Sequence, residues 1–385
     1  MIKGIFPTEK FREIRTPFYY YDMALLQDTL NVVKTEISKY GYYQHYAIKA
    51  NDNPRILSFI AQNGLGADCV SGGEIQAALD AGFPASKIVY AGVGKDDWEI
   101  NLGLDNDIAC FNVESLAELE VINELAAIKN KVATISLRIN PNVDGHTHAK
   151  ITTGLTENKF GINMGLLNGV LQEMRAMKNI RFTGLHFHIG SQITDLTSFR
   201  ELCIRSNELQ DEFEARGIKI EKMNFGGGLG IDYYHPNHLC IPEFENYFGI
   251  FNKLVKQREG QQIHFELGRS VVGQCGSLIS KVLYVKKGEA KQFAILDAGF
   301  TELIRPAMYD AYHHTENITS DEPFEVYDVV GPICESSDVF GKDVKLNKVK
   351  RHDLIAFRSA GAYGETMASQ YNCRKLPKSY FSDTI

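Results

Sequence analysis

Hydrophobic residues near the amino end of the sequence recur at steps of three and four positions, which predicts a helix with one apolar face. The residues that share this face are Met23, Leu26, Leu30, Val33 and Ile37. Asp22 stands just before this run and can cap the helix, and Gly41 stands just after it and can end the helix.

Short β-rich segments then alternate with helical ones as far as residue 267. The expected strands are 42–51, 66–70, 87–91, 108–113, 132–139, 181–189, 219–225 and 262–267. Ser71 and Glu74 have the spacing of a capping box at the start of one intervening helix. Eight strands that alternate with helices predict an α/β fold with a (β/α)8 barrel, and a doubly wound sheet is the competing arrangement.

The pattern changes after about residue 270. Short β-branched runs punctuated by glycine occupy 277–288, 292–299, 324–331 and 352–361. They predict an antiparallel β domain, sandwich-like or barrel-like, which the early segment TPFYYY (16–21) can join. We therefore expect a barrel over residues 23–268 and a β domain built from residues 1–22 and 269–385.

Composition narrows the possible partners. The 385-residue chain has a net charge of −7, so it lacks the broad basic field that nucleic-acid binding requires. No stretch approaches the roughly 20 apolar residues of a membrane-spanning helix, and the first residues do not resemble a signal peptide. Seven cysteines without a CxxC pair argue against a disulfide framework or a structural zinc site. These features predict a cytoplasmic protein with no nucleic-acid or membrane partner.

Residues capable of chemistry stand at the carboxyl ends of the expected strands, which is where barrel enzymes place their active sites. They are Lys49, Asp68, Arg138, His186, His188, the glycine-rich segment 226–230 and the segment Glu266-Leu267-Gly268-Arg269. Taken singly, Lys49 could be a solvated cation, the glycines a plain turn, and the two histidines core residues or metal ligands. Together, a lysine nucleophile, a phosphate cradle, a ring-facing histidine and a carboxylate on one rim predict a pyridoxal phosphate (PLP) site.

Longer motifs carry a family resemblance that extends from Lys49 to Asn372. YAIKAN (46–51), GLHFHIGSQ (184–192), NFGGGLGI (224–231) and ELGR (266–269) resemble the alanine-racemase-like PLP enzymes. DAGFTELIRPAMYDAYH (297–313), GPICESSD (331–338) and SAGAYGETMASQYN (359–372) resemble the diaminopimelate decarboxylase family specifically. The resemblance implies decarboxylation of meso-diaminopimelate to L-lysine and CO2, the last step of lysine biosynthesis.

The resemblance also implies roles for individual residues. Lys49 would be the Schiff-base lysine, His188 would stack on the PLP ring, and Glu266 would pair with the pyridine nitrogen. The other expected cofactor contacts are Asp68, Arg138, Ser191, Gly227, Gly228, Leu267, Gly268, Arg269 and Tyr363. The expected substrate contacts are Arg269, Arg305, Tyr309, Glu335 and Tyr363.

Cys334 would be the proton donor, and the family's homodimeric state implies that Cys334 and Glu335 reach into the active site of a second subunit. Arg305 could grip the distal carboxylate of the substrate and Glu335 its distal ammonium group. Leu267 departs from the family pattern, which usually has proline there. This difference concerns backbone stiffness more than chemistry.

Three other functions remain open at this point. Carboxynorspermidine, ornithine and arginine decarboxylases share the fold but do not need Arg305 for a second amino-acid end. A metal-dependent barrel hydrolase could use His186 and His188, although it leaves Lys49 and the glycines without a role. A non-catalytic PLP-binding protein would have no use for Cys334. We expect no metal.

Overall fold

The structure is a computed structural model that describes residues 6–143 and 159–385. The chain divides into two compact units, each described by itself. The barrel unit comprises residues 30–230 and 243–268, and the β unit comprises residues 1–29, 231–242 and 269–385. Segment 231–242 thus groups with the β unit, although it lies inside the range expected for the barrel. The boundaries at residues 22/23 and 268/269 stay a prediction.

The barrel unit contains a closed barrel of eight parallel strands, which confirms the (β/α)8 prediction over the doubly wound sheet. In order around the barrel, the strands are β2 (Tyr43–Ala47), β3 (Gly66–Cys69), β4 (Ile88–Tyr90), β5 (Cys110–Val113), β6 (Ala133–Arg138), β7 (Ile180–His186), β8 (Lys222–Asn224) and β9 (Gln262–Phe265). Each expected segment overlaps one of these strands.

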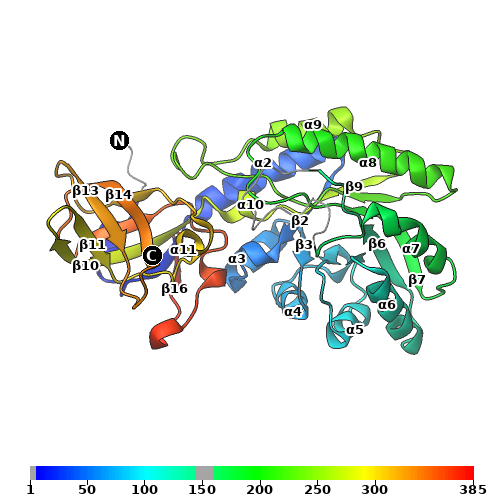
Figure 1. The fold of residues 1–385 in the computed structure, drawn as a ribbon, viewed down its shortest axis with the longest axis horizontal. Coiled ribbons are helices and arrows are strands. Elements are labelled where there is room, and N and C mark those ends of the chain that lie inside the picture. Colours follow the sequence, from blue (N-terminus) through cyan, green and yellow to red (C-terminus); the bar gives the residue numbers. More distant parts are fainter. Residues whose placement is uncertain (1–5, 144–158) are drawn as a thin grey trace. The chain divides into compact units, whose positions relative to one another are not determined.

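Helices follow the barrel strands in turn and surround them (Figure 1). They are α3 (Pro54–Gln62), α4 (Gly72–Asp80), α5 (Asp97–Asp105), α6 (Leu116–Ile128), α7 (Leu167–Met174), α8 (Thr197–Ala215) and α9 (Phe244–Leu254), with α2 (Met23–Tyr40) ahead of the first strand. The side chain of Asp22 accepts a hydrogen bond from the Leu25 N–H (3.0 Å), and Gly41 follows α2 with φ +67°, as the sequence predicts. Ser71 caps α4 by accepting from the Glu74 N–H.

The β unit is built on a mostly antiparallel eight-stranded sheet. Its strands are β1 (Phe18–Tyr21), β10 (Gly276–Lys287), β11 (Gln292–Leu296), β12 (Thr315–Asn317), β13 (Phe324–Val330), β14 (Val339–Asn347), β15 (Leu354–Phe357) and β16 (Lys378–Phe381). Strand β1 pairs with β10 as anticipated for TPFYYY, while the pairs β1–β16 and β11–β13 are parallel. Among the described residues, three short α-helices accompany the sheet: α1 (Thr8–Arg12), α10 (Arg269–Val272) and α11 (Arg305–Tyr309).

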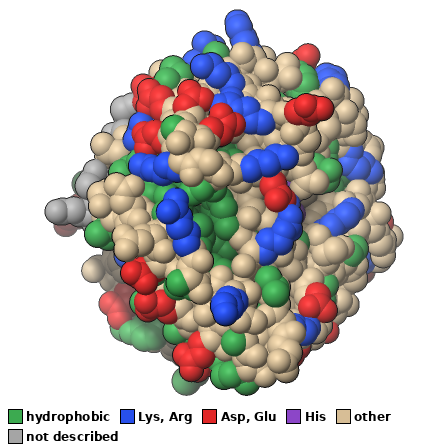
Figure 2. Space-filling model, turned by 90° about the vertical axis from the view of Figure 1, so that its right-hand side faces the viewer, with side chains coloured by type: hydrophobic (Ala, Val, Ile, Leu, Met, Phe, Trp, Pro, Cys, Tyr) green, Lys and Arg blue, Asp and Glu red, His purple; other side chains and the backbone are tan. Residues whose placement is uncertain are grey.

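Charged side chains of both signs occupy the surface. On the face shown in Figure 2, lysine and arginine surround a hollow with a hydrophobic floor, and acidic clusters lie near its edge. At the amino ends of strands β7 to β9, Arg181 and Glu221 form an ion pair over 2.6 Å beside a pocket. Within residues 6–143 and 159–385, no helix is long and apolar enough to cross a membrane.

Candidate active site

Lys49 stands at the carboxyl end of the first barrel strand, in a single 3-10 turn, η1 (Ile48–Ala50). The sequence placed it within the strand, but β2 ends at Ala47. The strand ends there because the Asn51 N–H turns back to the Ile48 carbonyl (3.0 Å). The Lys49 side chain is 38% exposed, so its amine is accessible, and its Nζ lies 3.8 Å from Oδ2 of Asp68.

Asp68 is the buried partner of this lysine. Burial raises the pKa of Asp68 well above its ordinary value, as does the charge of Glu266, and Lys49 opposes both. Its Oδ1 is buried and has no hydrogen-bond partner among the described residues. A buried polar atom of this kind, beside a lysine amine, is typical of a ligand site.

Glu266 follows β9 and accepts three hydrogen bonds inside the barrel unit. Oε1 accepts from the side-chain amides of Asn112 (3.2 Å) and Asn224 (2.6 Å), and Oε2 contacts Nε2 of His186 (2.8 Å). Burial disfavours the charged form, but His186 and Lys49 outweigh this effect and hold the pKa of Glu266 well below its usual value. The site therefore contains an oriented, ionised carboxylate.

The glycine-rich segment 226–230 follows β8 and packs closely against its neighbours. A Cβ on Gly226 would lie 2.3 Å from the Phe187 carbonyl oxygen, and one on Gly227 would lie 2.1 Å from the carbonyl oxygen of Glu266. Gly228 has φ +111° and leaves 2.8 Å between its ideal Cβ and the Gly190 carbonyl. Glycine is required here because three loops meet backbone to backbone.

His188 lies in the loop after β7, two residues beyond the end of the strand at His186. Its Nδ1 accepts a hydrogen bond from the Gly227 N–H (3.3 Å). Burial, followed by the charges of Lys49 and Arg138, lowers the pKa of His188 well below its usual value, so the ring is neutral. His186, the other histidine of this motif, contacts Glu266. Among the described residues, no group of His, Cys, Asp and Glu side chains is arranged to hold a metal ion.

The remaining expected cofactor residues of the barrel unit lie at strand ends or in the loops that follow them. Arg138 ends β6 and forms a buried ion pair with Glu114 (2.7 Å). The carbonyl of Leu267 accepts from the Ala47 N–H (3.3 Å), so the segment after β9 is bound to the last residue of β2, directly before the lysine turn. An ideal Cβ on Gly268 would lie 2.9 Å from that of Ala50, which explains the glycine. Ser191 lies in the loop between β7 and α8.

The β unit contains a second cluster, made of arginine and aromatic side chains. Nη1 of Arg269 donates to the hydroxyl of Tyr233 (2.6 Å), and the guanidinium lies 4.7 Å from the ring centre of Tyr363. The guanidinium of Arg305 also contacts Tyr233, at 4.7 Å from the centre of its ring. Nη1 of Arg305 contacts Nε2 of His313 (2.7 Å). Both arginines are almost fully buried. Such guanidinium groups suit binding of phosphate and carboxylate.

Cys334 and Glu335 lie on an exposed segment between β13 and β14. The Cys334 N–H donates to Oδ1 of Asn372 (3.3 Å), and the Tyr371 hydroxyl donates to Oε1 of Glu335 (2.7 Å). Two contacts therefore fix this segment while the thiol stays accessible. Tyr309 ends α11 and is partly buried.

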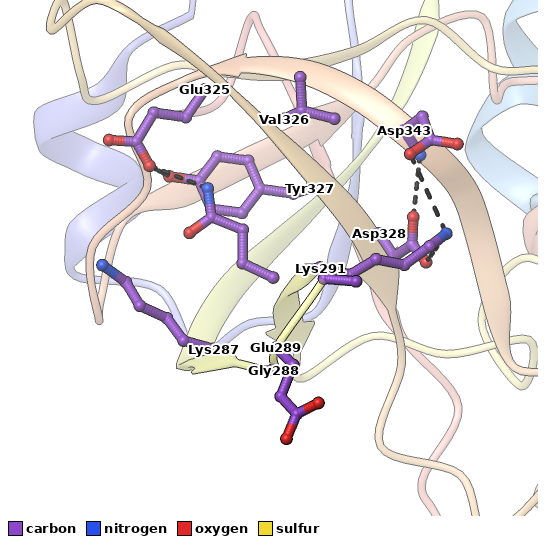
Figure 3. A pocket seen from close by; sticks show the side chains of 11 residues that line it. Lys287, Gly288, Glu289, Lys291, Glu325, Val326, Tyr327, Asp328 and Asp343 are labelled. Carbon is purple, nitrogen blue, oxygen red and sulfur yellow. Dashed lines mark hydrogen bonds and ion pairs between the residues drawn. The ribbon is translucent and has the colours of Figure 1, made fainter.

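A separate pocket of the β unit contains none of the expected site residues. It lies beside β11, β13 and β14, and several of its polar side chains contact one another (Figure 3). Lys291 lies 3.1 Å from Asp328, and the Gln292 amide donates to Glu325 (2.9 Å).

Sequence reasoning missed several contacts of the two clusters. Asn112 and Asn224 are polar residues in barrel strands, and this unusual position was the signal that could have identified them. Glu114 follows β5 and could have been found by the same rule that identified Asp68. For Tyr233 and His313 we find no signal in the sequence, because each lies in an irregular segment.

The barrel-unit groups fit pyridoxal phosphate. An accessible lysine amine can bind its aldehyde, an ionised Glu266 suits its protonated ring nitrogen, and a neutral His188 suits the ring face. The loops at segment 226–230 leave no room for side chains at Gly226 and Gly227, as a backbone cradle requires.

Comparison with known proteins agrees with this fit. Residues 25–273 match the family model of the pyridoxal-dependent decarboxylase, pyridoxal binding domain. A diaminopimelate decarboxylase of Bacteroides thetaiotaomicron is 66% identical over 385 residues, with 100% of both chains covered. One from Neisseria meningitidis serogroup B is 42% identical over 93% of this chain and 86% of its own.

Solved structures give the same result. The crystal structure of diaminopimelate decarboxylase from Helicobacter pylori complexed with L-lysine has a TM-score of 0.91 and 39% identity, and covers 97% of this chain and 93% of that chain. The enzyme from M. jannaschii has a TM-score of 0.93 and 36% identity, with 100% and 91% covered. The chain therefore belongs to the diaminopimelate decarboxylase family of pyridoxal-dependent decarboxylases.

Proposed function

We propose that the protein uses PLP to remove one carboxyl group of meso-diaminopimelate as CO2 and releases L-lysine. The observation that carries this proposal is Arg305, a buried guanidinium whose contacts are the uncharged side chains of His313 and Tyr233. Because a buried cation is costly without an anion, this residue calls for an anionic ligand. The second amino-acid end of diaminopimelate supplies a carboxylate of that kind.

The barrel-unit residues would hold and tune the cofactor. When bound, PLP supplies an electron-withdrawing ring that stabilises the negative charge left on the carbon that loses CO2. Lys49 would bind the aldehyde carbon through Nζ. Glu266 would keep the proton on the pyridine nitrogen, since its carboxylate is ionised and is oriented by two amides and His186. His188 would lie against the ring without competing for that proton, since it is neutral.

The phosphate would be bound by backbone and guanidinium groups. We assign this role to Gly227, Gly228, Gly268 and Arg269, with Ser191 and Arg138 nearby. The tight glycine loop and the buried Arg269 support the assignment. Tyr363, which stacks on Arg269, would contact both cofactor and substrate.

Arg305 and Glu335 would recognise the distal end of the substrate. Arg305 would bind the distal carboxylate with two parallel N–H groups, and Glu335 would accept from the distal ammonium. Cys334 would then donate the proton of its Sγ to the carbon that lost CO2.

We further propose that two copies of the chain form a homodimer in which Cys334 and Glu335 serve the active site of the other subunit. The exposure of both side chains, and their tethering by Tyr371 and Asn372, support this arrangement. A cytoplasmic location is proposed on the basis of seven cysteines without a disulfide.

The visible absorption spectrum of the purified protein tests the function. Meso-diaminopimelate is added while CO2 and lysine are measured together, and equal amounts of both products are expected. A cofactor band with no turnover would redirect the proposal to ornithine, arginine or carboxynorspermidine, which are assayed in parallel. If no band appears after PLP is supplied, the proposal is wrong.

A further inference from the structure

The guanidinium of Arg305 is held in place by uncharged groups. The side chain is 5% exposed, its Nη1 lies 2.7 Å from Nε2 of His313, and its Cζ lies 4.7 Å from the ring centre of Tyr233. Among residues 6–143 and 159–385, no carboxylate forms an ion pair with it. The charge of Arg305 is therefore oriented but not neutralised.

The tautomer of His313 follows from its second contact. Its Nδ1 lies 2.9 Å from the carbonyl oxygen of Arg358. A carbonyl oxygen can only accept, so Nδ1 carries the hydrogen and Nε2 presents its lone pair to Arg305. Burial, followed by the charge of Arg305, lowers the pKa of His313 to about 3, so this tautomer persists at neutral pH.

We propose that His313 is a positioning residue that aims the guanidinium of Arg305 at the distal carboxylate of the substrate. The inference rests on the proposed function, in which Arg305 binds that carboxylate. A neutral acceptor engages one N–H while the other donors stay available for a bidentate contact. A carboxylate in place of His313 would pair with Arg305 and compete with the substrate.

The ring of Tyr233 completes the support. It meets His313 edge-to-face at 5.1 Å and 82°, and Arg305 lies over it. His313 therefore restrains the guanidinium within its own plane, and the ring of Tyr233 restrains it perpendicular to that plane. Loss of the His313 acceptor would leave an N–H of a buried cation unpaired and let the group turn toward other partners.

Two inhibitors separate positioning from a general structural role. L-lysine keeps the amino-acid end that is not decarboxylated, so it carries the carboxylate assigned to Arg305, whereas pentane-1,5-diamine lacks it. Inhibition by both compounds, KM and kcat for meso-diaminopimelate, and the cofactor absorption band are measured on the dimeric holoenzyme. The variants are His313→Asn, His313→Gln and Arg305→Lys, with His314→Asn as the matched control.

Asparagine can still donate to the Arg358 carbonyl but is too short to reach Arg305, whereas glutamine can place its amide oxygen near the position of Nε2. We expect His313→Asn to raise KM and weaken inhibition by L-lysine roughly ten-fold or more. Inhibition by the diamine should change less than about two-fold, and kcat less than about three-fold. His313→Gln should recover most of the loss, and His314→Asn should resemble the native protein.

Equal losses for L-lysine and the diamine, or no loss for either, would overturn the role of His313. If His313→Asn loses its cofactor band, His313→Gln is used for the test instead. Equal losses of inhibition by L-lysine and by the diamine in that variant would also overturn the role of His313. Unchanged L-lysine inhibition in Arg305→Lys would instead overturn the assignment of Arg305. The two failures are therefore distinguishable.

Discussion

Nε2 of His186 contacts Oε2 of Glu266 over 2.8 Å, and both side chains are buried within the barrel unit. A side-chain amide at this position could also donate a hydrogen bond to Glu266, but His186 in addition lowers the pKa of this carboxyl. The contact keeps Glu266 ionised in spite of its burial. The contact also gives a role to His186, one of the two histidines in the motif at residues 184–192.

Glu266→Gln should therefore lower turnover strongly while PLP still binds. A neutral amide does not stabilise a proton on the ring nitrogen, and the loss of one preorganised electrostatic contact costs about 10²–10³ in kcat. The expected result is a retained absorption band with reduced kcat. A kcat within a few-fold of the native value would contradict the role of Glu266.

The same variant tests the pH dependence of stability. Because the pKa of Glu266 is lowered in the folded protein, its stabilising contribution is present above the ordinary value of 4.5 and is lost as the pH falls. Above pH 5, we expect the free energy of unfolding of the native apoprotein to exceed that of the Glu266→Gln apoprotein by about 1–3 kcal/mol. This difference should shrink below pH 4.5. Urea unfolding at a series of pH values measures this difference in the free energy of unfolding. The exposed Glu208→Gln is the control.

Lys49→Ala should abolish the absorption band of lysine-bound PLP and reduce turnover by several orders of magnitude, since no other residue is proposed to bind the aldehyde. Spectra are recorded with added PLP. Lys39→Ala is a suitable control because Lys39 is a surface lysine that pairs with Glu36. A native spectrum for Lys49→Ala would refute the anchor.

Arg305→Ala should damage turnover of diaminopimelate far more than cofactor binding. Removal of one partner of a buried charged pair costs about 2–5 kcal/mol, which corresponds to roughly thirty- to several-thousand-fold in kcat/KM. Arg351→Ala, which removes an exposed arginine 5.7 Å from the Tyr284 ring in the same unit, should have no effect. Unchanged kinetics for Arg305→Ala would refute the assignment.

Gly227→Ala should weaken PLP binding and destabilise the protein, because the new Cβ would lie 2.1 Å from the Glu266 carbonyl oxygen and the loop must move. Gly169 in α7 has no neighbour within 4 Å of its ideal Cβ, so Gly169→Ala should instead add about 0.5–1 kcal/mol of stability. Thermal melting and PLP titration compare the two. Equal behaviour would show that the glycine loop is not constrained by packing.

Two inactive variants test the shared active site. Lys49→Ala and Cys334→Ala are expressed together, so that hybrid dimers contain one site with both residues intact. Recovery of about a quarter of native activity is expected from random pairing. Activity no greater than that of the separate variants would show that each chain supplies its own cysteine.

The site was only partly predictable from the sequence. Lys49, Asp68 and Glu266 were found because the residues at strand ends share one rim of a barrel. The sequence did not identify Asn112, Asn224 and Tyr233, because their roles depend on which side chains they contact in the folded protein. The expected strands also ran too far at Lys49 and His188, where the backbone turns away although the residue pattern continues.

Periodicity and contiguous motifs were sufficient to predict the eight alternating strands, the change to a β unit, the cofactor class and the family. Three contacts became visible only in three dimensions: Glu266 is held by His186 and two asparagines, Arg138 pairs with Glu114, and His313 and Tyr233 hold Arg305. The physical reason is that protonation and orientation depend on burial and on neighbours distant along the chain. Local sequence does not specify those neighbours.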